Sequence, residues 1–176
     1  MNKQKYSLDS IVEWKNKVKA GDALLINGTL YIARDAAHKR LITAIECGEK
    51  LPFDLHNATI YYCGPTPNSE NAPIGACGPT TSARMDTYTP TLLANGVLCT
   101  IGKGDRSEMV YSEIKKHRAI YLVAVGGCGA LYANCVVSSE EIAYSDLGCE
   151  SIKRLVVKDF PVYVAIDSCG NSIFTK

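Results

Sequence analysis

The chain has 176 residues, of which 47% are apolar and 21% charged, and its formal net charge is +1. This balance predicts one globular domain over residues 1–176. It excludes a disordered chain and a nucleic-acid-binding face, which would need clustered Lys and Arg. Neither a secretory signal nor an unbroken apolar span is visible, so we expect a cytoplasmic protein that contacts no membrane.

Apolar spacing in the N-terminal third predicts helices that alternate with strands. In chain order we expect a short helix over 8–19, two strands within 21–33, a helix over 34–48 and a strand over 58–63. The dipeptide Asn27-Gly28 is typical of a two-residue hairpin turn and predicts that the first two strands pair with each other. The inward positions expected for the first helix are Leu8, Ile11, Val12 and Val18.

The rest of the chain continues this alternation. We expect a loop over 64–75, a helix up to 95–96, a strand over 97–101, a helix that begins at Asp105, a strand over 119–125, short strands near 142–145, 153–158 and 161–166, and a turn at 170–171. Strands separated by helices pair in parallel, whereas hairpins at both ends add antiparallel strands. We therefore predict an α/β fold with a mixed sheet, parallel in its centre and antiparallel at its outer strands.

Eight cysteines are many for this length, but no Cys-x-x-Cys pair occurs and only three histidines are present. Structural zinc and iron–sulfur sites usually contain at least one such short pair. We therefore expect no metal site in this chain, and we interpret most cysteines as reduced, buried side chains that act as small hydrophobic residues.

The first candidate for chemistry is the stretch ARDAAHKRL, residues 33–41. Arg34 and His38 are four residues apart at the start of a predicted helix, so they share a face one turn apart. A cation and an imidazole in this position could meet an anionic ligand. A solvated first helical turn flanked by Asp35 explains the same pattern.

The second candidate is GACGPTTSARMD, residues 75–86. A helix from Ser82 onward would leave free backbone N–H groups facing the loop, and such groups bind carboxylates and phosphates. Thr80 and Arg84 can face the same side of that helix. An ordinary capped helix accounts for the hydroxyls and the proline equally well, but not for a lone arginine one turn in.

The third candidate is Lys103 in GKGDRS, residues 102–107. This lysine follows the carboxyl end of a buried strand, which is where open α/β sheets hold ligands, although a surface lysine in a turn is an alternative. Together the three motifs describe a pocket for a small polyanion such as a dicarboxylate.

These three motifs, in this order, resemble the β subunit of the iron–sulfur-dependent hydro-lyases, class I fumarate hydratase and L(+)-tartrate dehydratase. The resemblance also includes YYCGPTP, LGCESI and DFPVYVAIDSCGN, and it covers nearly the whole chain. It implies the swivelling β/β/α domain. It also implies a separate α subunit that carries the [4Fe–4S] cluster, with two chains of each kind expected in the enzyme.

The resemblance assigns roles to five residues. It implies that Arg34, Arg84 and Lys103 hold the substrate carboxylates. Thr80 matches the residue assigned as catalytic base, and His38 matches an active-site histidine of the tartrate dehydratase branch. A threonine hydroxyl is a weak base unless nearby cations lower its pKa, so His38 stays open as the proton acceptor.

The substrate is predicted from two short runs. GKGDRS and LGCESI are closer to the fumarate hydratase patterns than to those of tartrate dehydratases. We therefore expect reversible hydration of fumarate to (S)-malate, with tartrate or mesaconate as alternative substrates. A stand-alone anion-binding module without catalysis is the alternative of a different class.

Overall fold

A seven-stranded sheet organises the chain, of which the computed structural model describes residues 4–68 and 72–174. In sheet order the strands are β1 (Gln4–Ser7), β2 (Ala23–Ile32), β3 (Thr59–Tyr61), β4 (Cys99–Gly102), β5 (Ile120–Val123), β7 (Ile152–Ile166) and β6 (Val136–Ala143). Strands β1 to β5 pair in parallel, and β7 is antiparallel to β2, β5 and β6. The predicted α/β fold with a mixed sheet and parallel central strands is confirmed.

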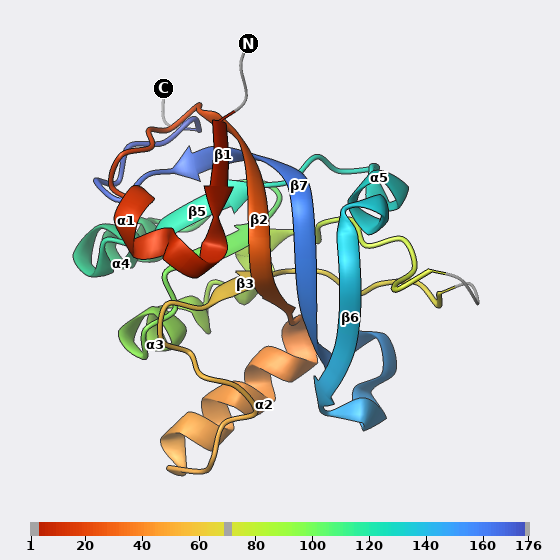
Figure 1. The fold of residues 1–176 in the computed structure, drawn as a ribbon. Helices are drawn as coiled ribbons and strands as arrows, with labels where there is room; N and C mark the ends of the chain where they lie inside the picture. The colour runs from red at the N-terminus through yellow and green to blue at the C-terminus, as the bar shows by residue number, and fades with distance from the viewer. Residues whose placement is uncertain (1–3, 69–71, 175–176) are drawn as a thin grey trace.

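The sheet closes on itself through β7. This long strand pairs with β2 over most of its length and with β5 at its carboxyl end. The pairings therefore run from β2 through β3, β4, β5 and β7 and return to β2. Figure 1 shows the consequence, because β7 bends near its carboxyl end and its last residues run alongside β5, whose direction crosses that of the long part of β7.

The closed sheet separates two apolar clusters. Successive strand residues point to opposite faces, so Tyr61 joins one cluster while Ile60 and Tyr62 join the other. The first cluster includes Trp14 and Phe160. The second cluster lies under the helices that cover the other face of β3 to β5.

Five helices and three 3₁₀ turns complete the described chain. They are η1 (Leu8–Ser10), α1 (Ile11–Trp14), α2 (Asp35–Glu46), η2 (Ser82–Met85), α3 (Thr89–Ala94), α4 (Glu108–His117), α5 (Gly129–Asn134) and η3 (Ser145–Glu150). Leu41 of α2, Leu92 of α3 and Ile114 of α4 belong to the second apolar cluster. The helix expected from Arg34 to Gly48 is confirmed, and its amino end lies beside β2 and β7 (Figure 1). Over residues 4–68 and 72–174 we find no helix with the length and apolar content to cross a bilayer.

The predicted hairpin at Asn27-Gly28 is wrong. Residues 23–32 form one continuous strand, and Gly28 lies at a bulge where the register with β7 shifts. Gly28 has a φ of +107°, and a Cβ atom there would lie 2.9 Å from the Asp9 carboxylate. Asn27 accepts a hydrogen bond from the backbone N–H of Asp159 instead of shaping a turn. The dipeptide therefore forms a β-bulge within β2, a strand that pairs with β1 and β3 as well as with β7.

Other predicted boundaries also differ. The first helix ends at Trp14, and Val12 is exposed instead of buried. The three short C-terminal strands are two, β6 and a 15-residue β7. Asp159, with a φ of +52°, and Pro161 lie inside β7 because a closed sheet requires a bent strand. The turn at 170–171 is present, with Gly170 donating to the Asp167 carbonyl.

The cysteines are less buried than expected. All eight are free, but only Cys63, Cys77 and Cys99 are buried. Three others are exposed and two are half-buried. The interpretation of cysteines as small hydrophobic residues is therefore wrong for the three exposed ones, while the half-buried Cys128 and Cys135 pack against the first apolar cluster.

Candidate active site

Arg34 and Arg84 meet at one carboxylate. Arg34 directly precedes α2, and Arg84 belongs to the four-residue turn η2. The Asp35 Oδ2 atom lies 3.3 Å from Nη2 of Arg84 and 3.9 Å from Nε of Arg34. The fold thus brings together the first two motifs, which are 50 residues apart in the sequence.

A second carboxylate, that of Glu150, also pairs with Arg34. Glu150 Oε1 lies 3.5 Å from Arg34 Nη2, and Glu150 Oε2 accepts a hydrogen bond from the free N–H of Ala36 in the first turn of α2. The Arg34 guanidinium packs directly against the backbone of Gly64. Any larger residue there would clash with it, because a Cβ atom at Gly64 would lie 2.5 Å from Arg34 Nη1. Arg34 is therefore held in place, with 21% of its side chain exposed.

Thr80 and Lys103 are joined through the backbone. The Lys103 N–H donates to the Thr80 carbonyl at 3.2 Å, and the Ser82 N–H donates to the Lys103 carbonyl at 3.0 Å. Both the backbone N–H and the hydroxyl of Thr80 donate to the Tyr62 carbonyl at the end of β3. Thr80 is half-buried and the Lys103 side chain is exposed, so the second and third motifs form one surface at the carboxyl ends of β3 and β4.

The predicted helix after Thr80 is wrong in its form. Residues 82–85 form a single 3₁₀ turn, and α3 begins only at Thr89. The Thr81 side chain makes no capping hydrogen bond. The predicted anion site on a long helix N-terminus is therefore absent among these residues, and the cations of Arg84 and Lys103 provide the positive charge.

His38 lies in the interior and not at the surface. Its side chain is fully buried, and its ring is 5.3 Å from the Tyr62 ring and 5.8 Å from the Tyr88 ring. Nδ1 lies 2.8 Å from the Arg34 carbonyl oxygen, which can only accept, so Nδ1 carries the proton. Burial lowers the pKa of His38 to about 4, which keeps the ring neutral near pH 7. Arg34 and His38 lie one turn apart as predicted, but the Arg34 side chain is partly exposed whereas the His38 ring is enclosed.

Sequence patterns did not identify a buried arginine beneath the site. The Arg106 side chain is fully enclosed, and its Nε donates to Asp86 at 2.6 Å. Asp86 also accepts from the N–H of Ser107, which replaces Asp105 as the N-cap of α4. This ion pair ties GPTTSARMD to GKGDRS. One sequence feature could have indicated this pair. Besides the residues expected to bind a ligand, GPTTSARMD contains the acidic Asp86 and GKGDRS contains the basic Arg106.

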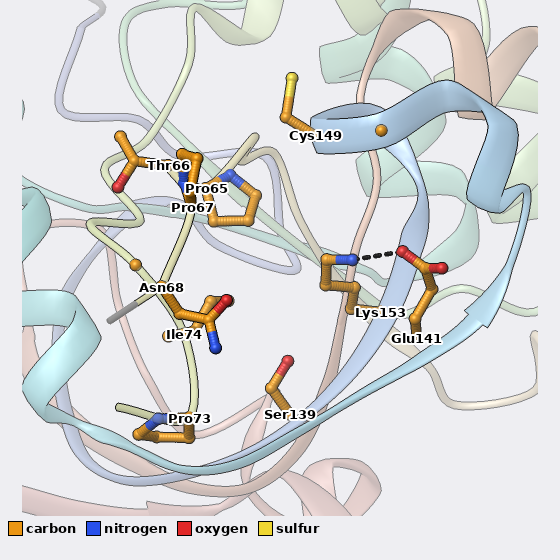
Figure 2. Close-up of a pocket in the computed structure, with 12 residues that line it drawn as sticks. Pro65, Thr66, Pro67, Asn68, Pro73, Ile74, Ser139, Glu141, Cys149 and Lys153 are labelled. Atoms are coloured by element: carbon orange, nitrogen blue, oxygen red, sulfur yellow. Dashed lines mark hydrogen bonds and ion pairs between the residues drawn. The ribbon is translucent and has the colours of Figure 1, made fainter. Parts of the chain in front are cut away.

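A pocket of about 450 Å³ is lined by residues from the loop after β3, from β6 and from the end of η3 (Figure 2). In Figure 2 the prolines of residues 65–67 form one wall, while Lys153, paired with Glu141, lies opposite. Its described lining contains none of the five predicted site residues. The pocket adjoins the site, because Pro65 follows Gly64 and Cys149 precedes Glu150.

The cysteines of this chain do not fit an iron–sulfur cluster. Within residues 4–68 and 72–174 no three His, Cys, Asp or Glu side chains are grouped to hold a metal ion. A hydrogen bond with Cys77 and burial both raise the pKa of Cys63, so that thiol stays protonated, whereas a metal ligand must be a thiolate.

Comparison with known proteins identifies the family. Residues 2–176 match the family described as Fumarase C-terminus. The chain belongs to the fumarase C-terminus family. This membership agrees with the resemblance carried by RDAAH, GPTTSARM and GKGDRS.

Relatives of this fumarase C-terminus chain fall into two kinds. Fumarate hydratase 2 of Leishmania major is 34% identical over 174 residues, and the aerobic class I fumarate hydratase of Escherichia coli (strain K12) is 39% identical over 155 residues. The matches cover 98% and 87% of this chain but only 31% and 28% of those proteins. The putative L(+)-tartrate dehydratase subunit beta of Methanocaldococcus jannaschii is 39% identical over 166 residues, and the match covers 91% of this chain and 85% of that protein.

Proposed function

We propose that this chain is the β subunit of an iron–sulfur-dependent hydro-lyase that hydrates fumarate reversibly to (S)-malate. The observation that carries the proposal is the meeting of Arg34 and Arg84 at Asp35, beside the backbone-paired Thr80 and Lys103. Membership of the fumarase C-terminus family supports it.

The three cations supply the electrostatics that this reaction needs. Removal of a proton next to a carboxylate builds negative charge on that carboxylate, and fixed positive groups stabilise the charge as it grows. Arginine forks match carboxylates bidentately, and Lys103 adds a flexible point charge. In this arrangement Arg34, Arg84 and Lys103 bind the substrate carboxylates.

The hydroxyl of Thr80 is our candidate for proton transfer. This hydroxyl donates a hydrogen bond to the Tyr62 carbonyl, and as a base it would act in its deprotonated form, which the cations of Arg84 and Lys103 would stabilise. His38, the alternative, is enclosed by the protein and bonded to the Arg34 carbonyl. Its burial favours Thr80 as the catalytic base and His38 as a neutral residue that supports the first turn of α2.

A second chain completes the proposed site. The matched region is less than a third of the fumarate hydratases, and the Methanocaldococcus jannaschii relative is named as a beta subunit. We infer that a separate α subunit in the cytoplasm holds the [4Fe–4S] cluster, with two chains of each kind in the enzyme. The cluster would supply a Lewis acid for the substrate hydroxyl.

The L(+)-tartrate dehydratase reaction is the second candidate, because the Methanocaldococcus jannaschii relative matches over most of its length. Tartrate carries an extra hydroxyl that needs a partner in the pocket, and a buried partner left unpaired costs about 1–3 kcal/mol. We expect kcat/KM for (S)-malate to exceed that for L(+)-tartrate by about tenfold or more. A reversed ratio in side-by-side kinetics would assign the enzyme to the tartrate branch.

The proposed function is tested by adding and omitting the partner. The chain is purified anaerobically, alone and co-expressed with the chain that matches the remaining part of a fumarate hydratase, and fumarate hydration is followed after iron and sulfide reconstitution. We expect turnover only from the two-chain protein. Turnover by the lone chain would disprove the subunit assignment. An inactive, fully reconstituted pair would instead favour the anion-binding module.

Variants of the two-chain enzyme separate binding from proton transfer. Arg84→Lys keeps the charge but loses the fork, so we expect KM to rise about tenfold or more and kcat to fall as well. The control Arg154→Lys changes an exposed arginine paired with Glu140, and it should retain wild-type kinetics.

Thr80→Ala should lower kcat at least about 100-fold, since a proton-transfer group acts in the transition state. Thr80→Ser keeps the hydroxyl and should recover most of that loss. If Thr80→Ala stays within about threefold of wild-type kcat, which is roughly 0.7 kcal/mol of barrier, the base is a different group.

A further inference from the structure

Asp35 lies between the two arginines of the proposed carboxylate site. Its Oδ2 atom is buried and makes no hydrogen bond within standard geometry, although both guanidinium groups lie within 4 Å of it. The Arg34 Nε atom is likewise buried without a hydrogen-bond partner. Buried polar atoms are nearly always hydrogen-bonded, so this pair requires an explanation.

The two arginines differ in how they are held. Glu150 pairs with Nη2 of Arg34, and Nη1 of Arg34 packs against the Gly64 backbone, so both constrain Arg34 independently of Asp35. Arg84 projects from a four-residue turn, and 48% of its side chain is exposed. Within residues 4–68 and 72–174, Asp35 is the carboxylate that forms an ion pair with Arg84.

Two guanidinium groups placed side by side repel each other unless a negative charge lies between them. The Asp35 carboxylate supplies this charge and places one nitrogen atom of each arginine on either side of a single oxygen. Loss of the carboxylate would leave Arg34 in place and free Arg84 to move away. The distance between the cations, and hence the length of a dianion that can bridge them, therefore depends on Asp35.

We propose that Asp35 is a positioning residue that sets the spacing of Arg34 and Arg84 and thereby selects a four-carbon dicarboxylate over a longer one. This inference rests on the proposed function, because it takes the two arginines as the substrate clamp. It assigns Asp35 no direct contact with the reacting atoms.

The test measures binding of unreactive dicarboxylates to the two-chain protein by calorimetry, which needs no turnover. Succinate, with four carbons, is compared with glutarate, with five. We expect the wild-type protein to bind succinate at least tenfold more tightly than glutarate. Asp35→Asn should weaken succinate binding about tenfold or more and bring the two ligands within about threefold of each other.

Two further variants separate positioning from folding. Asp35→Glu keeps the charge on a longer side chain, so its succinate affinity should fall less than that of Asp35→Asn while its length preference still weakens. Asp146→Asn removes a carboxylate that pairs with Arg40 on the exposed side of α2, and it should bind both ligands like the wild type. Urea unfolding of each variant reports whether the fold is intact.

The outcomes distinguish the two claims. A wild-type protein that binds neither dicarboxylate overturns the proposed function and the positioning role with it. A wild-type preference for succinate that both folded Asp35 variants retain overturns the positioning role alone. If Asp35→Asn fails to fold, the length preference of Asp35→Glu decides the question in the same way.

Discussion

Single residues in the first turn of α2 have three different roles. Arg34 is partly exposed and faces the site, Asp35 joins it to Arg84, and His38 points into the protein. The Arg34 backbone links these roles, because its carbonyl accepts hydrogen bonds from both the backbone N–H and Nδ1 of His38. The neutral imidazole thus supports the backbone from which the Arg34 side chain projects.

The burial of His38 predicts a specific pH dependence of stability. Its folded-state pKa of about 4 is below the ordinary value of 6.5, so the unfolded chain binds the proton more readily. The contribution of His38 is complete above pH 6.5 and is lost as the pH falls toward 4. Between pH 7.5 and 5.0 this loss amounts to about 2 kcal/mol of unfolding free energy.

Urea unfolding at these two pH values checks the prediction. His38→Gln should lose about 2 kcal/mol less than the wild type over the same interval, because its side chain does not titrate. His56→Gln removes an exposed histidine and serves as the control. The same pH dependence for both variants would show that His38 does not titrate as inferred.

At the scale of elements, a buried ion pair connects η2 to α4 beneath the proposed site. Asp86 follows η2 and Arg106 precedes α4, and their ion pair is enclosed between the rings of Tyr62 and Tyr121. Arg106 also donates to Thr89 at 2.6 Å, at the start of α3. Three elements thereby acquire a fixed relation, and the positions of Arg84 and Lys103 follow from it.

Removal of the buried cation should be strongly destabilising. Arg106→Met leaves the Asp86 carboxylate buried without its partner, which typically costs about 3–5 kcal/mol of unfolding free energy. Arg154→Met breaks a comparable pair with Glu140 at the surface and should cost less than about 1 kcal/mol. Denaturant unfolding of both variants measures the difference. Equal costs would mean that burial does not strengthen the Asp86–Arg106 pair.

At the scale of the whole molecule, β7 holds the sheet closed. Its residues pair with β2 and β6 on opposite sides, and its last residues pair with β5. The site lies at the carboxyl ends of β3 and β4, whereas α2 and its arginine start from the end of β2. Because β2 and β3 pair in parallel, the carboxyl end of β2 lies beside that of β3, and this places Arg34 near Arg84.

A proline in β7 should open this ring. Val156 pairs with Thr29 of β2 on one side and with Ser138 of β6 on the other. A proline there removes a backbone N–H that faces one of these two strands and places its ring against that strand. We expect Val156→Pro to lower the unfolding free energy by more than about 3 kcal/mol. Val137→Pro is the matched control, because Val137 is the unpaired, exposed residue of the bulge in β6. Comparable melting temperatures of the two variants would contradict the role assigned to β7.

The sequence alone determined the local features of this protein. The spacing of apolar residues and the positions of glycines predict α2 and the buried strands β4 and β5. Such elements depend on residues only a few positions apart in the sequence. Arg34 and Lys103 closely follow strands whose carboxyl ends lie at one edge of a parallel sheet, so their placement there was predictable too. Residues 80–84 follow a loop, and they reach this edge through the hydrogen bonds of Thr80 to the Tyr62 carbonyl.

The tertiary structure decided what depends on distant partners. Asn27-Gly28 has the composition of a turn, but pairing with β7 makes it a bulge. The same helical turn contains Arg34 and His38, yet only the packing of Tyr62 and Tyr88 encloses the imidazole. The pairing of Asp35 with Arg84 and of Asp86 with Arg106 joins residues from separate elements. Burial and ion pairing are properties of the assembled environment, which no local pattern encodes.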